Sequence, residues 1–193
     1  AKYYLYWIKR LLLIVNALVV IWLVSGISLQ LYEFRDSDPD RGAIMNGTDK
    51  FGDRFSQVTY LAQGWSASDS LWFYNTSQGS NLLPYSFFLV LEQSDSSALF
   101  RSDENIDRYG YLPQRPTISN PDGLPVGMVR DRYQGKNYMG FTCAACHTTQ
   151  INYAGTGMRI DGGPANSDME SFMIDLVNAL YATLENPDKL DRF

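Results

Sequence analysis

Apolar residues near the start of the chain form one long run. From residue 11 to residue 31 the sequence reads LLLIVNALVVIWLVSGISLQL and contains no charged side chain. A helix rises 1.5 Å per residue, so this run matches the roughly 30 Å hydrocarbon core of a bilayer. The pattern predicts a transmembrane helix, and we assign residues 1–34 to a short N-terminal segment followed by that helix.

The charges that flank the apolar run predict its orientation. Lys2, Lys9 and Arg10 precede it, whereas acidic residues crowd the segment just after it. By the positive-inside rule the N-terminus lies in the cytoplasm, so we expect a single-pass protein of the bacterial inner membrane whose remaining residues face the periplasm. A cleaved signal peptide is the alternative, because residues 11–24 alone suit its apolar region and small residues follow at 25 and 26.

Turn-forming residues dominate the chain between the apolar run and residue 64. This segment contains Asp38-Pro39-Asp40 and Asn46-Gly47, which are turn signals. Residues 35–64 are therefore expected to form a linker that leads away from the membrane. The aromatic-rich sequence that follows, residues 65–193, has a length typical of one folded domain.

Helical signals recur within residues 65–193. Short helices are expected near residues 68–74 and 84–92, whereas the prolines and glycines of residues 112–128 predict a long loop. The capping box at residues 167–170 (SDME) begins a helix whose apolar positions repeat at spacings of three and four, and Pro187 begins another. Strands have little support, so the expected fold is mainly α: the transmembrane helix plus a helical domain with long loops.

Composition narrows the choice of partners. The chain has 16 Lys and Arg against 21 Asp and Glu, and no acid precedes residue 33, so the domain is its acidic part. Nucleic-acid binding rests largely on cations that neutralise phosphates, so no nucleic-acid partner is expected. The expected partners are membrane lipid around the helix and a redox protein or the subunits of a larger membrane complex.

The two cysteines and the single histidine of the chain fall within five consecutive residues. Cys143 and Cys146 are separated by two alanines, and His147 follows directly. This CxxCH spacing is typical of c-type haem attachment, in which both thiols add to haem vinyl groups and the imidazole binds the iron. We therefore predict one covalent haem c, bound by Cys143, Cys146 and His147.

Two other uses of the motif stay open. A CxxC pair also forms disulfides or thioredoxin-like redox centres, and the periplasm permits disulfides. A structural zinc site is the other alternative, although it normally needs four protein ligands and the chain offers two cysteines and one histidine.

The sixth iron ligand lies outside the motif. Because His147 is the only histidine, this ligand is a methionine, another group, an external residue, or nothing. Met158 is the candidate, since it lies in a glycine-containing segment rather than on the apolar stripe of the last helix. Arg159 beside it is a candidate partner for a haem propionate, because guanidinium binds carboxylate bidentately. A solvated surface arginine is the alternative for Arg159.

From about residue 65 to residue 193 the chain resembles the cytochrome-c family of di-haem peroxidases, particularly the branch related to rubber oxygenases. The stretches that carry the resemblance are residues 72–74 (WFY), 78–80 (QGS), 120–127 (NPDGLPVG), 141–147 (FTCAACH) and 159–164 (RIDGGP). The resemblance implies an α-helical cytochrome-c-like domain and, in peroxidase and oxygenase members, a second haem domain. The chain departs from that pattern because it has no second CxxCH and carries an apolar N-terminal run.

Electron transfer by a membrane-anchored c-type cytochrome is the expected function. An alternative is the N-terminal haem part of a di-haem peroxidase or oxygenase, whose open iron position would bind peroxide or dioxygen. A further alternative is a structural membrane subunit whose haem stabilises its fold. The sequence leaves open whether the chain is an enzyme, and it identifies neither a donor nor a substrate.

Overall fold

The computed structural model describes residues 2–33 and 41–193. The chain divides into two compact units, residues 1–35 and 36–193. Each unit is described by itself.

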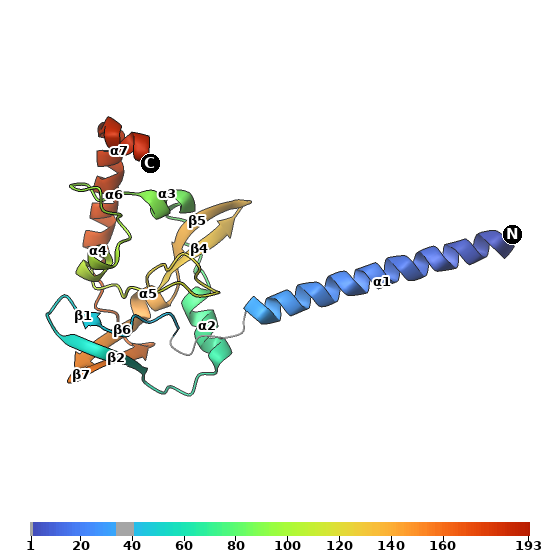
Figure 1. Cartoon of the computed structure of the whole chain (residues 1–193), viewed down its shortest axis with the longest axis horizontal. Coiled ribbons are helices and arrows are strands. Elements are labelled where there is room, and N and C mark those ends of the chain that lie inside the picture. The colour runs from blue at the N-terminus through green and yellow to red at the C-terminus, as the bar shows by residue number, and fades with distance from the viewer. Residues whose placement is uncertain (1, 34–40) are drawn as a thin grey trace. The chain divides into compact units, whose positions relative to one another are not determined.

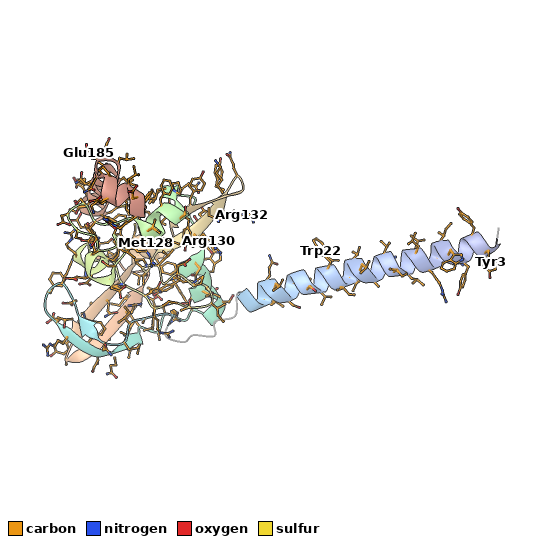
Figure 2. The ribbon with its side chains drawn as sticks, turned by 45° about the horizontal axis from the view of Figure 1, so that its top comes forward. Tyr3, Trp22, Met128, Arg130, Arg132 and Glu185 are labelled. Carbon is orange, nitrogen blue, oxygen red and sulfur yellow. The ribbon has the colours of Figure 1, made fainter. Side chains whose placement is uncertain are left out.

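The first unit is the single helix α1 (Lys2–Glu33). Its segment Tyr6–Leu31 is long and apolar enough to cross a membrane. The described side chains of this segment are exposed, and Figure 2 shows Tyr3 and Trp22 projecting away from the helix. A helix that is apolar all round needs an apolar environment. The predicted apolar helix is thus confirmed as a candidate membrane span or signal sequence.

The second unit contains two β-sheets, so the expectation of a mainly α fold is wrong. One curled sheet has the strand order β1-β2-β7-β6, and the other has the order β3-β5-β4. The strands are β1 (Gly47–Thr48), β2 (Arg54–Tyr60), β3 (Leu83–Pro84), β4 (Met128–Tyr133), β5 (Lys136–Phe141), β6 (Thr148–Tyr153) and β7 (Gly155–Asp161). The fold of this unit is mixed α and β.

Two hairpins turn on loops that the sequence pattern does not reveal. Gln134 and Gly135 join β4 to β5, and Ala154 and Gly155 join β6 to β7, all with positive φ. Positive φ at both central residues is the type I′ geometry, which matches the twist of the flanking strands. Asn-Gly is the strong signal for this turn, and neither loop carries it.

The expected linker supplies part of the first sheet. Residues 47–60 contain β1 and β2, and β2 pairs in parallel with β7. The register places Tyr60 beside Arg159. This segment therefore helps to build the surroundings of Arg159.

The expected helices are present in the second unit. They are α2 (Ala67–Asn75), α3 (Tyr85–Val90), α6 (Met169–Glu185) and α7 (Pro187–Arg192), joined by α4 (Asp103–Arg108) and α5 (Ala144–His147). The N-cap of α6 is Asp168 rather than Ser167, and its carboxylate accepts the backbone N–H of Ser171 at 3.0 Å. No helix or strand occurs in residues 112–127, so the predicted long loop is confirmed there.

Aromatic rings from several elements fill the main core. Phe172 of α6 is fully buried, and its ring centroid lies 5.5 Å from those of Phe100 and Tyr109 and 5.3 Å from that of Tyr111. Phe141 at the end of β5 packs against the same ring. Figure 1 shows α3, α6 and α7 at one end of this unit and β2, β6 and β7 at the other, with α5 between them.

Candidate functional site

The CxxCH motif forms the one-turn helix α5, directly between β5 and β6. Thr142 is fully buried, and its side-chain oxygen accepts the backbone N–H of Ala144 at 3.2 Å. The N–H of His147 donates to the carbonyl of Cys143 at 3.0 Å and closes the turn. Two strands therefore fix both ends of the motif.

The two sides of this turn differ in exposure. Cys143, Cys146 and His147 are exposed, whereas Ala144 and Ala145 are buried. Gly127 explains how closely the buried side packs, because a Cβ added there would lie 2.1 Å from the backbone nitrogen of Ala145. The structure thus brings the three chemically active side chains to the open side of one rigid turn.

Neither a disulfide nor a shared metal site links the side chains of the motif in the described structure. Cys143 and Cys146 are free thiols. Within the part of the chain that the structure describes, no three His, Cys, Asp or Glu side chains gather closely enough to hold a metal ion. The described residues thus supply no ligand set for zinc.

A buried hydroxyl lies beneath α5. Tyr111 is buried with its ring stacked on Phe141, and its hydroxyl has no hydrogen-bond partner among the described residues. Burial raises the pKa of Tyr111 to about 12, although a side-chain interaction with Ser167 opposes that shift and nearby Cys146 adds to it. The hydroxyl therefore lies near both Ser167 and Cys146 and makes no short hydrogen bond to a described residue.

Arg159 is buried under the curled sheet. Its Nε and Nη2 donate to the side-chain oxygen of Gln150 at 3.2 and 2.9 Å, and its Nη1 donates to the Tyr60 hydroxyl at 3.4 Å. Only 2% of Arg159 is exposed, so the surface-arginine alternative is excluded. The guanidinium of Arg41 also lies over the Tyr60 ring, 4.2 Å from its centroid.

A buried carboxylate completes this polar interior. Asp161 accepts the Tyr74 hydroxyl at 2.5 Å and the Thr148 hydroxyl at 3.4 Å. Burial raises the pKa of Asp161, although Tyr74, Arg41 and Arg159 all oppose that shift. Sequence reasoning assigned no role to Tyr60, Tyr74 and Asp161, because they come from a helix and two strands that only the folded chain brings together.

Met158 and Arg159 lie on opposite faces of β7. Met158 pairs with Ile151 across the hairpin and is 43% exposed, whereas Arg159 points inward. The hairpin begins beside α5, where the N–H of Gly162 donates to the carbonyl of His147 at 2.6 Å. Met158 lies three residues along β7 from Asp161, roughly 10 Å at 3.3 Å per residue. The structure therefore brings Cys143, Cys146 and His147 together and leaves Met158 further along the outer face.

Comparison with known proteins gives one relative. The chain is 32% identical over 162 residues to a protein of Sinorhizobium fredii (strain NBRC 101917 / NGR234) named "Uncharacterized protein y4iJ". The match covers 72% of this chain and 26% of that protein, so the chain spans about a quarter of its relative. No protein family and no solved structure match the chain.

Proposed function

We propose that the chain is a membrane-anchored c-type cytochrome that carries one covalent haem and transfers electrons on the periplasmic face of the bacterial inner membrane. The observation that carries this proposal is α5. Every cysteine and the only histidine of the chain project from the open side of one turn, while two alanines fill its buried side. A flat macrocycle can approach such a turn from one direction.

The residues of α5 fit a haem for two reasons. Both thiols are free, so each is available for a thioether bond. The exposed side chains of Cys143, Cys146 and His147 share the open side of one turn, as the attachment of a single macrocycle by this motif requires.

Each residue has a distinct role in this proposal. Cys143 and Cys146 would hold the porphyrin through thioether bonds, and His147 would bind the iron. A bound haem supplies reversible one-electron oxidation and reduction at its iron. Thr142 and the close contact of Gly127 with Ala145 hold the turn still, so that the His147 imidazole needs little reorganisation. Met158 stays the proposed sixth ligand because it is an exposed methionine, although the structure leaves it further along β7 than the three motif residues.

The anchor is part of the proposal. The N-terminus is cytoplasmic, α1 crosses the bilayer once, and residues 41–193 lie outside, as the cations before the span indicate. Fusing alkaline phosphatase, which is active only after export, behind residue 193 tests this orientation. Activity in membrane fractions is expected; activity released into the soluble fraction would favour a cleaved signal peptide instead.

The haem is tested by producing the full chain with a c-type haem maturation system. A pyridine haemochrome assay is expected to report one haem c per chain, which stays attached under denaturing conditions. The double variant Cys143→Ser, Cys146→Ser is expected to carry none, and Tyr153→Ser, an exposed change on the same hairpin, is the matched control. Full haem attachment in the double variant, or none in the native chain, would refute the proposal.

Carbon monoxide separates electron transfer from oxygen or peroxide chemistry. Iron with a Met158 ligand is expected to resist carbon monoxide, and Met158→Ala is expected to open the site. A native chain that binds carbon monoxide would instead favour a second candidate, the N-terminal haem part of a larger di-haem peroxidase or oxygenase. That candidate is supported by the greater length of the relative, of which this chain covers 26%.

A further inference from the structure

A cavity of about 330 Å³ lies in the second unit, beside Arg159 and apart from α5. It falls within the size range of small-molecule sites, which starts at roughly 300 Å³. One part of its wall is apolar and is made by Ile44, Phe55, Leu112 and Pro113. None of the three CxxCH residues lines it, so the cavity is a separate site from the proposed haem attachment.

A chain of hydrogen bonds runs along the polar wall of the cavity. Arg159 Nη2 donates to the Gln150 oxygen at 2.9 Å, and the Gln150 nitrogen donates to the Asn152 oxygen at 2.8 Å. The Asn152 nitrogen then donates to Asp49 Oδ2 at 2.7 Å. Two amides therefore separate a cation at one end of the wall from an anion at the other.

No carboxylate of the described residues contacts the guanidinium at the cationic end. Arg159 is 2% exposed and feels the charge of Asp161, two residues along β7, but makes no direct ion pair with any residue that the structure describes. Its hydrogen bonds go to neutral groups and use three of its five N–H donors. A buried charge is costly unless it is paired. Two N–H groups remain for a ligand carboxylate at this end.

At the anionic end of the wall, carboxylates outnumber cations among the lining residues. Burial raises the pKa of Asp49, but the hydrogen bonds from Asn152 and nearby backbone N–H groups together outweigh burial. The pKa therefore lies below its usual value, and this carboxyl is ionised. Asp107 is half-buried, its carboxyl accepts no hydrogen bond that the described residues show, and it feels the charge of Asp49. Lys50 is the cation nearby, and its Nζ donates to the Asn166 carbonyl at 3.3 Å. Asp103 and Glu104 add negative charge on the same wall.

We propose that this cavity binds a small zwitterion, with its carboxylate on Arg159, its ammonium group at Asp49 and Asp107, and its apolar body against Phe55 and Leu112. A simple carboxylic acid would face repulsion from the acids, and a simple amine would leave Arg159 unpaired. Because two amide side chains separate the charged ends, an amino acid whose charges are several methylenes apart fits better than an α-amino acid.

Three matched probes test the proposal by calorimetric titration of the full chain in detergent. The probes are 5-aminovalerate with both charges, valerate with only the carboxylate, and pentylamine with only the amine. The expected result is that 5-aminovalerate binds at least tenfold more tightly than either of the others. Equal binding of one singly charged probe, or no binding of 5-aminovalerate, would overturn the proposal without any variant.

Variants locate the probe in the cavity. Asp107→Asn and Arg159→Gln are each expected to weaken 5-aminovalerate at least tenfold, whereas Arg132→Gln on β4, outside the cavity and labelled in Figure 2, is expected to leave it unchanged. Asp107→Asn replaces a half-buried carboxylate by an amide of the same shape. Unchanged binding in this variant would refute the site. Titrating haem-loaded and haem-free chains completes the test: binding to the haem-free chain alone would mean that a haem propionate occupies Arg159 and would also overturn the proposal.

Discussion

The interiors at the two ends of the second unit differ in the side chains that fill them. Around α6 the interior is aromatic, with the rings of Phe100 and Phe141 both in contact with that of Phe172. Under the curled sheet the interior holds Arg159 and Asp161, while apolar side chains such as those of Ile151 and Met158 face outward. Buried charge seldom improves stability over apolar packing. The helical end also buries the ion pair of Glu92 with Lys189, so the two ends differ in aromatic packing rather than in buried charge alone.

The largest expected effect tests the aromatic end. Phe172→Ala removes a fully buried ring that contacts Phe100, Tyr109, Tyr111 and Phe141, so it is expected to lower the free energy of unfolding by about 3–5 kcal/mol. Urea denaturation followed by tryptophan fluorescence measures this loss. Leu184→Ala on the same helix is the control, because Leu184 is 69% exposed and the change is expected to cost under about 0.5 kcal/mol. Equal losses in both variants would contradict the assignment of the core.

A smaller effect is expected at the sheet end. A Cβ on Gly157 would lie 2.6 Å from the Gln150 side-chain nitrogen and 2.9 Å from the Asn152 oxygen, so Gly157→Ala is expected to push both amides out of line at a cost of about 1–3 kcal/mol. Gly163→Ala is the control, because the nearest atom there is a side-chain carbon of Ile160 at 3.3 Å. The same urea titration checks both, and a neutral Gly157→Ala would show that the amide row is not rigid.

The sequence predicted the helices of this unit but not its sheets. It placed α2, α3, α6 and α7, because apolar spacing, capping residues and prolines are local signals, although α2 begins at Ala67, with Ser66 as its N-cap, rather than at residue 68. It missed the sheets, because β6 and β7 turn polar side chains inward and their hairpin lacks Asn-Gly. Pairing of β2 with β7 joins residues about a hundred positions apart, which no local pattern reports.

The candidate site was likewise predicted only where its residues are adjacent in the sequence. Cys143, Cys146 and His147 are adjacent in sequence, so their spacing alone predicted a shared turn. Arg159 was expected at the surface or beside a propionate, and its burial beside Tyr60 depends on strand pairing. The cavity draws on residues from 44 to 166, so only the folded chain reveals it.

The two ends are expected to change the stability of the chain with pH in opposite directions. Hydrogen bonds from Arg192 at 2.6 Å and Lys189 at 3.2 Å lower the pKa of Glu92, at the helical end, to about 2. Its contribution is therefore fully present above pH 4.5 and is lost as pH falls towards 2. At the sheet end, burial raises the pKa of Asp161 above 3.8, so the folded chain binds this proton more readily and stability falls as pH rises through that window.

Two variants separate these opposing slopes. Glu92→Gln is expected to lower stability near neutral pH and to flatten the loss between pH 4.5 and 2. Asp161→Asn is expected to remove the opposite slope above pH 3.8 while it keeps an acceptor for Tyr74. Thermal unfolding monitored by circular dichroism from pH 2 to 7 measures both. Slopes of the same sign would contradict the contrast between the two interiors.

The smallest expected effects concern one hydroxyl at each end. Tyr74 donates to Asp161 at 2.5 Å, and the Thr148 hydroxyl still donates to this carboxylate after Tyr74→Phe, so the change is expected to cost about 0.5–1.5 kcal/mol. Tyr111 interacts with Ser167 but makes no short hydrogen bond to a described residue, so Tyr111→Phe in the haem-free chain is expected to change stability by under about 1 kcal/mol. If the haem-loaded chain instead loses stability on Tyr111→Phe, the hydroxyl has found an acceptor that haem attachment provides beside Cys146. If both forms lose stability, the hydroxyl is already bonded in the protein, and the contrast between the satisfied polar interior of the sheet and the unsatisfied hydroxyl of the aromatic core disappears.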